Sequence, residues 1–135
     1  MFKIILISHG EFVLELVKSA EMIAGELKDV QTFGIATGCD IDEFKQTVEI
    51  AIKNATNNDE LLVLTDIMYG SPFNVVASLM DKYDFQHFSG INLPILLEII
   101  VSRKHSGLSK VIEIVNDISQ TTFVHVNELI KKEKI

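Results

Sequence analysis

The sequence predicts a single α/β domain in which a mostly parallel sheet is covered by helices on both faces. The chain has 135 residues, of which 47% are hydrophobic, and this is enough for one sizeable core but not for two ordinary domains. Short β-prone segments alternate four times with amphipathic helical patterns. Because buried parallel strands are apolar on both faces, the near-continuous apolar runs favour a parallel sheet with right-handed crossovers.

Four segments have the composition of sheet strands, and a fifth is expected near the end of the chain. Residues 2–7 are an almost continuous apolar run, and residues 30–36 and 61–64 are β-rich and bounded by polar or turn residues. Residues 85–91 form the fourth candidate. Residues 121–126 are β-prone, and we expect there a short C-terminal strand that can run antiparallel to the others.

Helical periodicity fills the segments between these strands. Apolar residues recur at steps of three and four residues, which places them on one face of a helix. The expected helices cover residues 13–27, residues 44–55, a segment that begins near residue 71, about residues 95–104 and about residues 108–119. Met22 and Phe73 belong to two of these helices, and we expect both to pack in or at the edge of the core.

Two of the helix starts are marked by capping residues. Asp40 and Glu43 have capping-box spacing before the second helix, although Asp replaces the usual Ser or Thr. Ser71 followed by Pro72 predicts a cap and a first helical residue for the third helix. These signals fix where the loops that follow the strands give way to helices.

Charge and composition exclude several classes of function. Twelve Lys and Arg against nineteen Asp and Glu give a net charge of −7 without a basic stripe, so no nucleic acid partner is expected. No apolar run approaches the roughly 20 residues that cross a bilayer, and the apolar start is too short for a signal peptide. The single Cys39 offers neither a disulfide nor a paired-cysteine metal site. We therefore expect a cytoplasmic protein.

His9 is the main candidate for a reacting residue. In parallel α/β sheets ligands bind beyond the carboxyl ends of the strands, and His9 lies between the first strand and the first helix. The following Gly10 permits close approach of a phosphate to backbone amides. A neutral imidazole, with an unperturbed pKa of about 6.5, is a competent nucleophile, and the phosphoramidate it forms can pass its phosphoryl group onward.

Three further residues at neighbouring strand ends complete the predicted site. Asp66 can accept a hydrogen bond from one ring nitrogen of His9, aim the other nitrogen outward and stabilise positive charge on the ring. Gly70 and Ser71 supply backbone amides and a hydroxyl for phosphoryl oxygens. Each residue alone has an ordinary structural interpretation, since Ser and Asp often cap helices and loops. Their joint placement with Gly10 favours a phosphate site.

The sequence predicts neither a metal site nor a nucleotide cofactor. His87, His105 and His125 are scattered without partners at ligand spacing, and we expect them on strand or loop surfaces. The chain lacks the G-x-x-x-x-G-K-[ST] loop of many ATP-binding proteins and the G-x-G-x-x-G turn of dinucleotide sites. A partner protein must then deliver the phosphate.

Four pieces of the sequence together resemble one known family. They are residues 4–10 (IILISHG), residues 18–22 with Gly25 and Glu26, Asp66 leading to residues 70–74 (GSPFN), and residues 90–94 (GINLP). The chain resembles, over essentially its whole length, the IIA domain of the mannose/fructose/sorbose family of the bacterial phosphoenolpyruvate-dependent sugar phosphotransferase system. The resemblance implies one IIA domain over residues 1–135, with the IIB component on another polypeptide.

The resemblance also implies roles for individual residues. His9 corresponds to the phosphorylated histidine, which accepts phosphate from the phosphocarrier protein HPr and gives it to IIB. Asp66 corresponds to the aspartate partner of that histidine, and Ser71 to the serine near the phosphoryl group. The family is typically a homodimer that can exchange its C-terminal strand, here residues 121–126. The membrane components IIC and IID are indirect partners, and they chiefly set the sugar.

One position departs from the family pattern. The family commonly has two glycines before the Ser-Pro-Phe-Asn stretch, whereas this chain has Tyr69 and then Gly70. A side chain at Tyr69 restricts the loop and can reshape the rim that meets HPr or IIB.

Three alternative functions remain open at this point. The phosphotransfer subunit of dihydroxyacetone kinase has a closely similar N-terminal domain, so His9 could serve a soluble kinase instead of a transporter. A receiver-like or ligand-sensing module would use Asp66 as phosphoacceptor or His9 as a polar contact. Receivers need acidic residues for magnesium after the first strand, where this chain has Ser8 and His9 with only Glu11 nearby. A dimeric scaffold without chemistry is a weaker third possibility.

Overall fold

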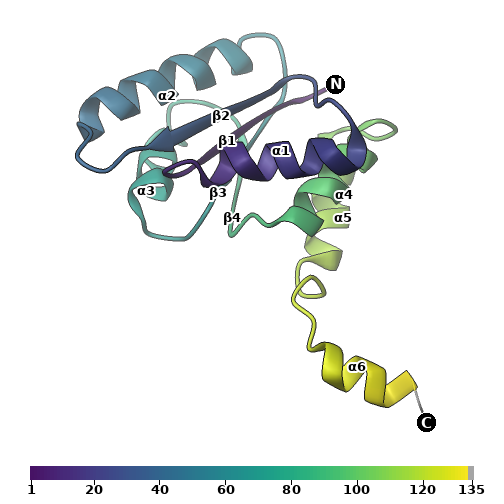
Figure 1. Cartoon of the computed structure of the whole chain (residues 1–135). Helices are drawn as coiled ribbons and strands as arrows, with labels where there is room; N and C mark the ends of the chain where they lie inside the picture. The colour runs from purple at the N-terminus through teal and green to yellow at the C-terminus, as the bar shows by residue number, and fades with distance from the viewer. Residues whose placement is uncertain (134–135) are drawn as a thin grey trace.

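Four parallel strands form the sheet that positions every other element in the computed structural model, which describes residues 1–133 (Figure 1). They are β1 (Lys3–His9), β2 (Val30–Ile35), β3 (Leu61–Thr65) and β4 (Gln86–Ser89). The strand order is β2-β1-β3-β4, and each neighbouring pair is parallel. The four predicted strands are therefore confirmed, and the α/β fold class with them.

The two central strands are the most apolar because both of their faces are covered. All five residues of β3 are buried, as are five of the seven residues of β1. The outer strands β2 and β4 consist mostly of half-buried or exposed residues. This difference explains why residues 2–7 and 61–64 gave the clearest strand patterns in the sequence.

Helices cover both faces of the sheet, as predicted (Figure 1). One face packs against α1 (Phe12–Ala24), α4 (Leu93–Arg103) and α5 (Leu108–Ile118). The other face packs against α2 (Ile41–Thr56) and α3 (Ser71–Ala77). No helix in the described part of the chain combines the length and the hydropathy of a membrane span.

Strand β1 supplies side chains to both halves of the core. Ile4 and Leu6 point into the cluster with α1, α4 and α5, whereas Ile5 and Ile7 point into the cluster with α2 and α3. Each of the four is at most 1% exposed, and burial of such a side chain stabilises the fold by about 1.5–3 kcal/mol. The strand that ends in His9 is thus among the most firmly held parts of the protein.

The capping predictions are right for α2 and displaced by one residue for α3. Asp40 caps α2, because its Oδ1 accepts backbone N–H groups two and three residues ahead at 2.8 and 3.3 Å. Helix α3 instead has Gly70 as its N-cap, so Ser71 is the first helical residue and Pro72 the second. The extended Gly70 already directs its carbonyl to the N–H of Asn74 at 2.9 Å. The Ser71 hydroxyl therefore does not cap this helix.

The predicted C-terminal strand does not form. Residues 119–125 are turns, bends and irregular chain, and α6 (Val126–Glu133) follows directly. A strand requires a hydrogen-bonding neighbour, and within residues 1–133 no strand pairs with residues 121–126. Figure 1 shows this segment leaving the body of the domain, with α6 well away from the sheet. Exchange of the segment between two subunits stays a prediction.

The expectation that Met22 packs in the core is also wrong. Its side chain is 88% exposed, because α1 turns Val13 and Ala20 toward the sheet and Met22 toward solvent. Phe73 is half-buried in the first turn of α3, in agreement with a place at the edge of the core.

Candidate functional site

The register of β1 and β3 brings His9 and Asp66 to one edge of the sheet. These strands are parallel neighbours in which Ile7 pairs with Thr65. His9 is the last residue of β1, and Asp66 directly follows the last residue of β3. Both side chains therefore lie at the carboxyl ends of the two central strands, where ligands of such sheets bind.

Asp66 holds His9 through two hydrogen bonds to one carboxylate oxygen. Asp66 Oδ2 accepts the backbone N–H of His9 at 2.9 Å and lies 2.7 Å from Nδ1 of the ring. The other oxygen, Oδ1, accepts the backbone N–H of Ile67 at 2.9 Å. Because an ionised carboxylate only accepts hydrogen bonds, the neutral form of the ring carries its proton on Nδ1 and keeps a free lone pair on Nε2.

The environment of Asp66 favours its ionised form. Burial by itself raises the pKa of this carboxyl, but the hydrogen bonds from the backbone and ring of His9 and from the Ile67 N–H outweigh burial. The pKa of Asp66 is consequently below its ordinary value. The side chain of Asp66 is 11% exposed and that of His9 is 51% exposed, so a largely covered anion orients an accessible ring.

Gly70 lies directly against the imidazole of His9. A Cβ atom built on Gly70 would be 2.8 Å from Cε1 and 3.3 Å from Nε2 of that ring, closer than ordinary contact allows. The backbone of Gly70 and the start of α3 therefore border the free nitrogen, and Ser71 is the next residue along the chain. The structure thus brings together His9, Asp66 and Gly70 as the sequence predicted.

Gly10 contributes a turn and not a free amide. It has φ +53°, a left-handed conformation that favours glycine, and its N–H donates to the carbonyl of Ile35 at 2.8 Å. The sequence interpretation missed Gly34, where a Cβ would stand 1.9 Å from the Gly10 carbonyl oxygen. A glycine inside a strand often marks such a close backbone approach, and this signal could have identified it.

The sequence interpretation also missed the structural role of Ser8. This residue is fully buried, and its hydroxyl accepts the N–H of Val13 at 3.1 Å while donating to the His9 carbonyl at 3.1 Å. Ser8 thereby links the end of β1 to the first turn of α1. Its position one residue before His9 was the only available sequence signal.

His87 lies on strand β4 as a half-buried residue, more covered than the expected surface position, whereas His105 and His125 are exposed. The ring of His87 lies half-buried next to the loop that carries Asp66, with Nε2 2.9 Å from the hydroxyl of Thr65. The pKa of His87 is lowered from 6.5 to about 4 because burial disfavours the charged ring. His87 is thus a neutral group at neutral pH.

Tyr69 adopts a left-handed backbone conformation, with φ +64°. This conformation is costly for a residue with a Cβ atom, by roughly 1–2 kcal/mol. Its side chain is 75% exposed and packs edge-to-face on Phe73, with ring centroids 5.3 Å apart. The restricted loop expected from Tyr69 is therefore strained at this residue.

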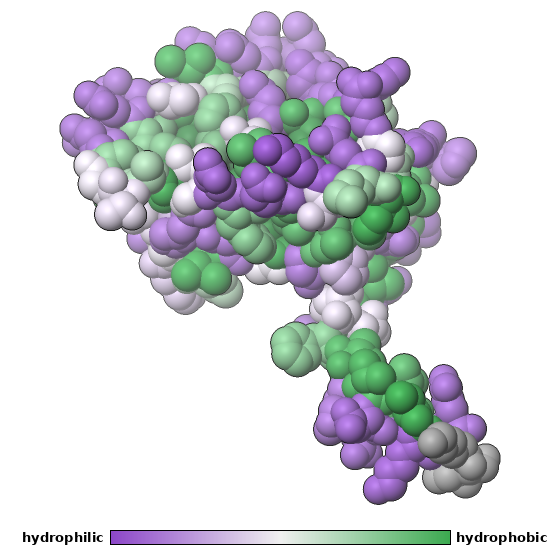
Figure 2. Space-filling model, in the orientation of Figure 1, coloured by the Kyte–Doolittle hydropathy of each residue, from purple (hydrophilic) through white to green (hydrophobic). Residues whose placement is uncertain are grey.

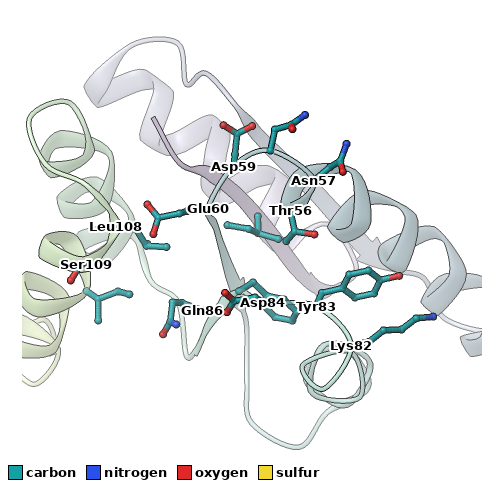
Figure 3. Close-up of a pocket in the computed structure, with 14 residues that line it drawn as sticks. Thr56, Asn57, Asp59, Glu60, Lys82, Tyr83, Asp84, Gln86, Leu108 and Ser109 are labelled. Atoms are coloured by element: carbon teal, nitrogen blue, oxygen red, sulfur yellow. The ribbon is translucent and has the colours of Figure 1, made fainter.

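A wide groove lies away from His9. It has a volume of about 900 Å³ and is lined by the start of β3, the turn before β4 and the start of α5 (Figure 3). Asp59, Glu60 and Asp84 border it, while the Lys82 ammonium at its rim is bound to Glu49 at 2.7 Å. Within residues 1–133, no three His, Cys, Asp or Glu side chains are placed to hold a metal ion.

Comparison with known proteins identifies the family. The family model described as "PTS system fructose IIA component" matches residues 3–116. The fructose-specific EIIA component of the phosphotransferase system (PTS) of Bacillus subtilis is 31% identical over 135 residues, which cover 99% of this chain and 92% of that protein.

Solved structures agree with this assignment. The phosphotransferase component EIIA from Streptococcus agalactiae superposes with a TM-score of 0.82 at 30% identity, over 95% of this chain and 99% of that one. The mannose/sorbose-specific IIA subunit from Enterococcus faecalis gives 0.81 at 28% identity, over 91% and 92% of the two chains. The chain therefore belongs to the mannose/fructose/sorbose-type family of PTS IIA components, which are phosphotransferases of sugar uptake.

Proposed function

We propose that His9 is the phosphorylated residue of this IIA component, which takes its phosphoryl group from phospho-HPr and gives it to the IIB component. The observation that carries the proposal is the 2.7 Å contact between His9 Nδ1 and Asp66, combined with a ring that is 51% exposed. This geometry leaves Nε2 unprotonated and within reach of a partner protein. The membrane components IIC and IID would take part only indirectly, through IIB.

The chemistry follows from the two ring nitrogens. The lone pair of Nε2 forms a bond to phosphorus while the bond between phosphorus and the donor breaks, and the donor keeps that electron pair. Nδ1 retains its proton, so the phosphorylated ring carries positive charge beside the Asp66 carboxylate. Asp66 stabilises this charge without taking the proton. The same steps in reverse order pass the phosphoryl group to the next protein.

Gly70 and Ser71 are the groups that we propose to hold the phosphoryl oxygens. Gly70 borders Nε2, and the Ser71 hydroxyl does not cap α3. The first N–H groups of a helix have no partner within the helix and suit an anion. Gly10 serves the site through its turn, because its N–H is already bonded to Ile35.

We further propose a homodimer that is formed by the C-terminal arm, defined as residues 119–133. None of the residues of α6 is buried, and Phe123 is 98% exposed. Figure 2 shows apolar side chains gathered along one side of the arm. An isolated helix of this length is marginal in water, and β4 is an outer strand of the sheet. A second copy could cover the arm and pair with that strand.

We also propose that residues 1–135 form one cytoplasmic IIA unit, because a IIA family model matches residues 3–116 and a stand-alone EIIA component matches 99% of the chain. Deletion of residues 119–135 tests the dimer by sedimentation. We expect the full chain to sediment as a dimer and the deletion protein as a monomer. A deletion protein that still sediments as a dimer would contradict this role of the arm.

The central proposal is tested by labelling with phosphoenolpyruvate, enzyme I and HPr. We expect an acid-labile, base-stable phosphoryl group on the wild-type protein and none on His9→Ala. His105→Ala is the matched control, because it removes another exposed imidazole that lies outside the site. Label that persists on His9→Ala would show that another residue is the acceptor.

A further inference from the structure

The loop of residues 66–70 follows β3 and carries two groups that contact His9, and the Asn74 side chain donates to its Tyr69 carbonyl at a long 3.5 Å. Asp66 binds the ring, and Gly70 lies against it. Between them, Ile67 and Met68 are 58% and 56% exposed and thus contribute little buried surface. The strained backbone of Tyr69 persists only if its surroundings hold it. Something outside the loop must therefore fix its shape.

His87 contacts Thr65, the last residue of β3, directly before this loop. Thr65 is fully buried at the end of β3, and its hydroxyl lies 2.9 Å from Nε2 of His87 on the neighbouring β4. Because burial lowers the pKa of His87 to about 4, the ring stays neutral and uncharged near neutral pH. The imidazole therefore offers a neutral hydrogen bond to the residue directly before Asp66.

Through Phe73, His87 also supports the far end of the loop. The rings of His87 and Phe73 have centroids 5.2 Å apart, with a tilt of 41°. Phe73 in turn receives the edge of Tyr69, the residue directly before Gly70. Such aromatic pairs are worth about 0.5–1.5 kcal/mol beyond their buried area. One side chain on β4 is thus connected to both ends of the loop.

We propose that His87 is a positioning residue for phosphoryl transfer: it holds Thr65 and, through Phe73, Tyr69, and so sets Asp66 and Gly70 against the ring of His9. This inference rests on the proposed function of His9. His87 does not touch the reacting atoms, and it acts through the loop. Its loss should loosen the hydrogen bond that fixes the His9 tautomer.

The test uses two substitutions that remove the same hydrogen bond from opposite sides. His87→Leu keeps an apolar side chain under Phe73, and Thr65→Val is close to isosteric at a buried strand position, so the fold should persist. His87→Gln retains a side-chain amide that can bond to Thr65. His105→Leu makes the same replacement at an exposed histidine outside the site.

Two measurements are made on the full chain. Proton–nitrogen NMR of ¹⁵N-histidine reports the tautomer of His9 without any donor, and single-turnover transfer from phospho-HPr reports rate and half-saturating concentration. We expect both His87→Leu and Thr65→Val to produce a mixture of the two His9 tautomers. Both should also slow transfer by about three- to tenfold, which is the effect expected when one hydrogen bond is lost. The half-saturating concentration of phospho-HPr should change little in these two variants. The rates and tautomers of His87→Gln and His105→Leu should remain near those of the wild type.

Unchanged His9 nitrogen shifts and rates in both His87→Leu and Thr65→Val would overturn the proposal. So would an equal loss in folded His87→Gln and His87→Leu, because the Thr65 hydrogen bond would then not carry the effect. Absence of label on wild-type His9 would instead reject the proposed function. The tautomer measurement needs no donor and would still decide the positioning role.

Discussion

Substitution of Gly70 by alanine should slow phosphoryl transfer while leaving the fold almost unchanged. Gly70 has φ −84° and ψ 173°, an extended backbone that any residue can adopt, so alanine introduces no backbone strain. The new Cβ would, however, lie 2.8 Å from Cε1 of His9. Relief to ordinary contact near 3.4 Å requires a movement of about 0.6 Å.

The ring that must move is the imidazole of His9, which forms a short hydrogen bond with Asp66. His9 Nδ1 is 2.7 Å from Asp66, and a shift of the ring stretches this contact or turns Nε2 away from its direction of attack. A misplacement of 1 Å can cost about 10²-fold in rate, so the expected loss here is about tenfold. Single-turnover transfer from phospho-HPr measures it.

The chain provides a matched control at Gly107. This glycine is the N-cap of α5 with φ −79° and ψ 175°, nearly the backbone of Gly70, and a Cβ there meets no atom within 4 Å. Both Gly→Ala changes should lower the free energy of unfolding by a similar amount, about 0.5–1 kcal/mol, because alanine is a poor cap. A Gly70→Ala protein that transfers phosphate as fast as Gly107→Ala would refute the steric argument.

Three other predictions concern neighbouring groups. Asp66→Asn should retain the fold but slow transfer by about 10²-fold or more in the same assay, because the amide cannot stabilise the charged ring. An unchanged rate would remove Asp66 from the mechanism. Tyr69→Gly should be more stable to urea than Tyr69→Ala by about 1 kcal/mol. Both variants lose the contact with Phe73, but only glycine adopts the positive φ without strain. If the alanine variant is the more stable of the two, the backbone is not strained at this residue. The pKa of His87 is about 4 in the folded protein against 6.5 without burial, so the unfolded chain binds this proton first as the pH falls. The neutral His87 ring therefore contributes fully to the free energy of unfolding above pH 6.5, and this contribution, at most about 3 kcal/mol, is lost as the pH falls toward 4. Urea titrations of His87→Gln should lack this part of the pH dependence.

Much of the site was predictable because it lies at the ends of strands that the sequence marks clearly. The apolar run before His9 and the buried run before Asp66 identify two strands, and parallel pairing brings their carboxyl ends together. Side-chain chemistry then suggests the hydrogen bond that is observed at 2.7 Å. Local pattern and a general rule of sheet geometry were sufficient for this pair.

Contacts made across the fold were not predictable in the same way. His87 was interpreted as a surface residue because its half-buried place depends on how β4 packs beside β3. Gly34 gave only the weak signal of a glycine in a strand, since its partner is the Gly10 carbonyl of another loop. Met22 was expected inside because its neighbours fit the helical period, yet its direction on α1 leaves it in solvent.

The sequence by itself determined the alternation of strands and helices and the buried centre of the sheet. It also identified His9 and Asp66 as candidate site residues. These features follow from the period of apolar residues and from residue chemistry, both of which are local. Only the tertiary structure decided that Gly70 lies against the imidazole, that His87 contacts Thr65 and that residues 121–126 form no strand within one chain. Each of these depends on a partner distant in sequence, and a strand without a neighbour to accept its hydrogen bonds does not form.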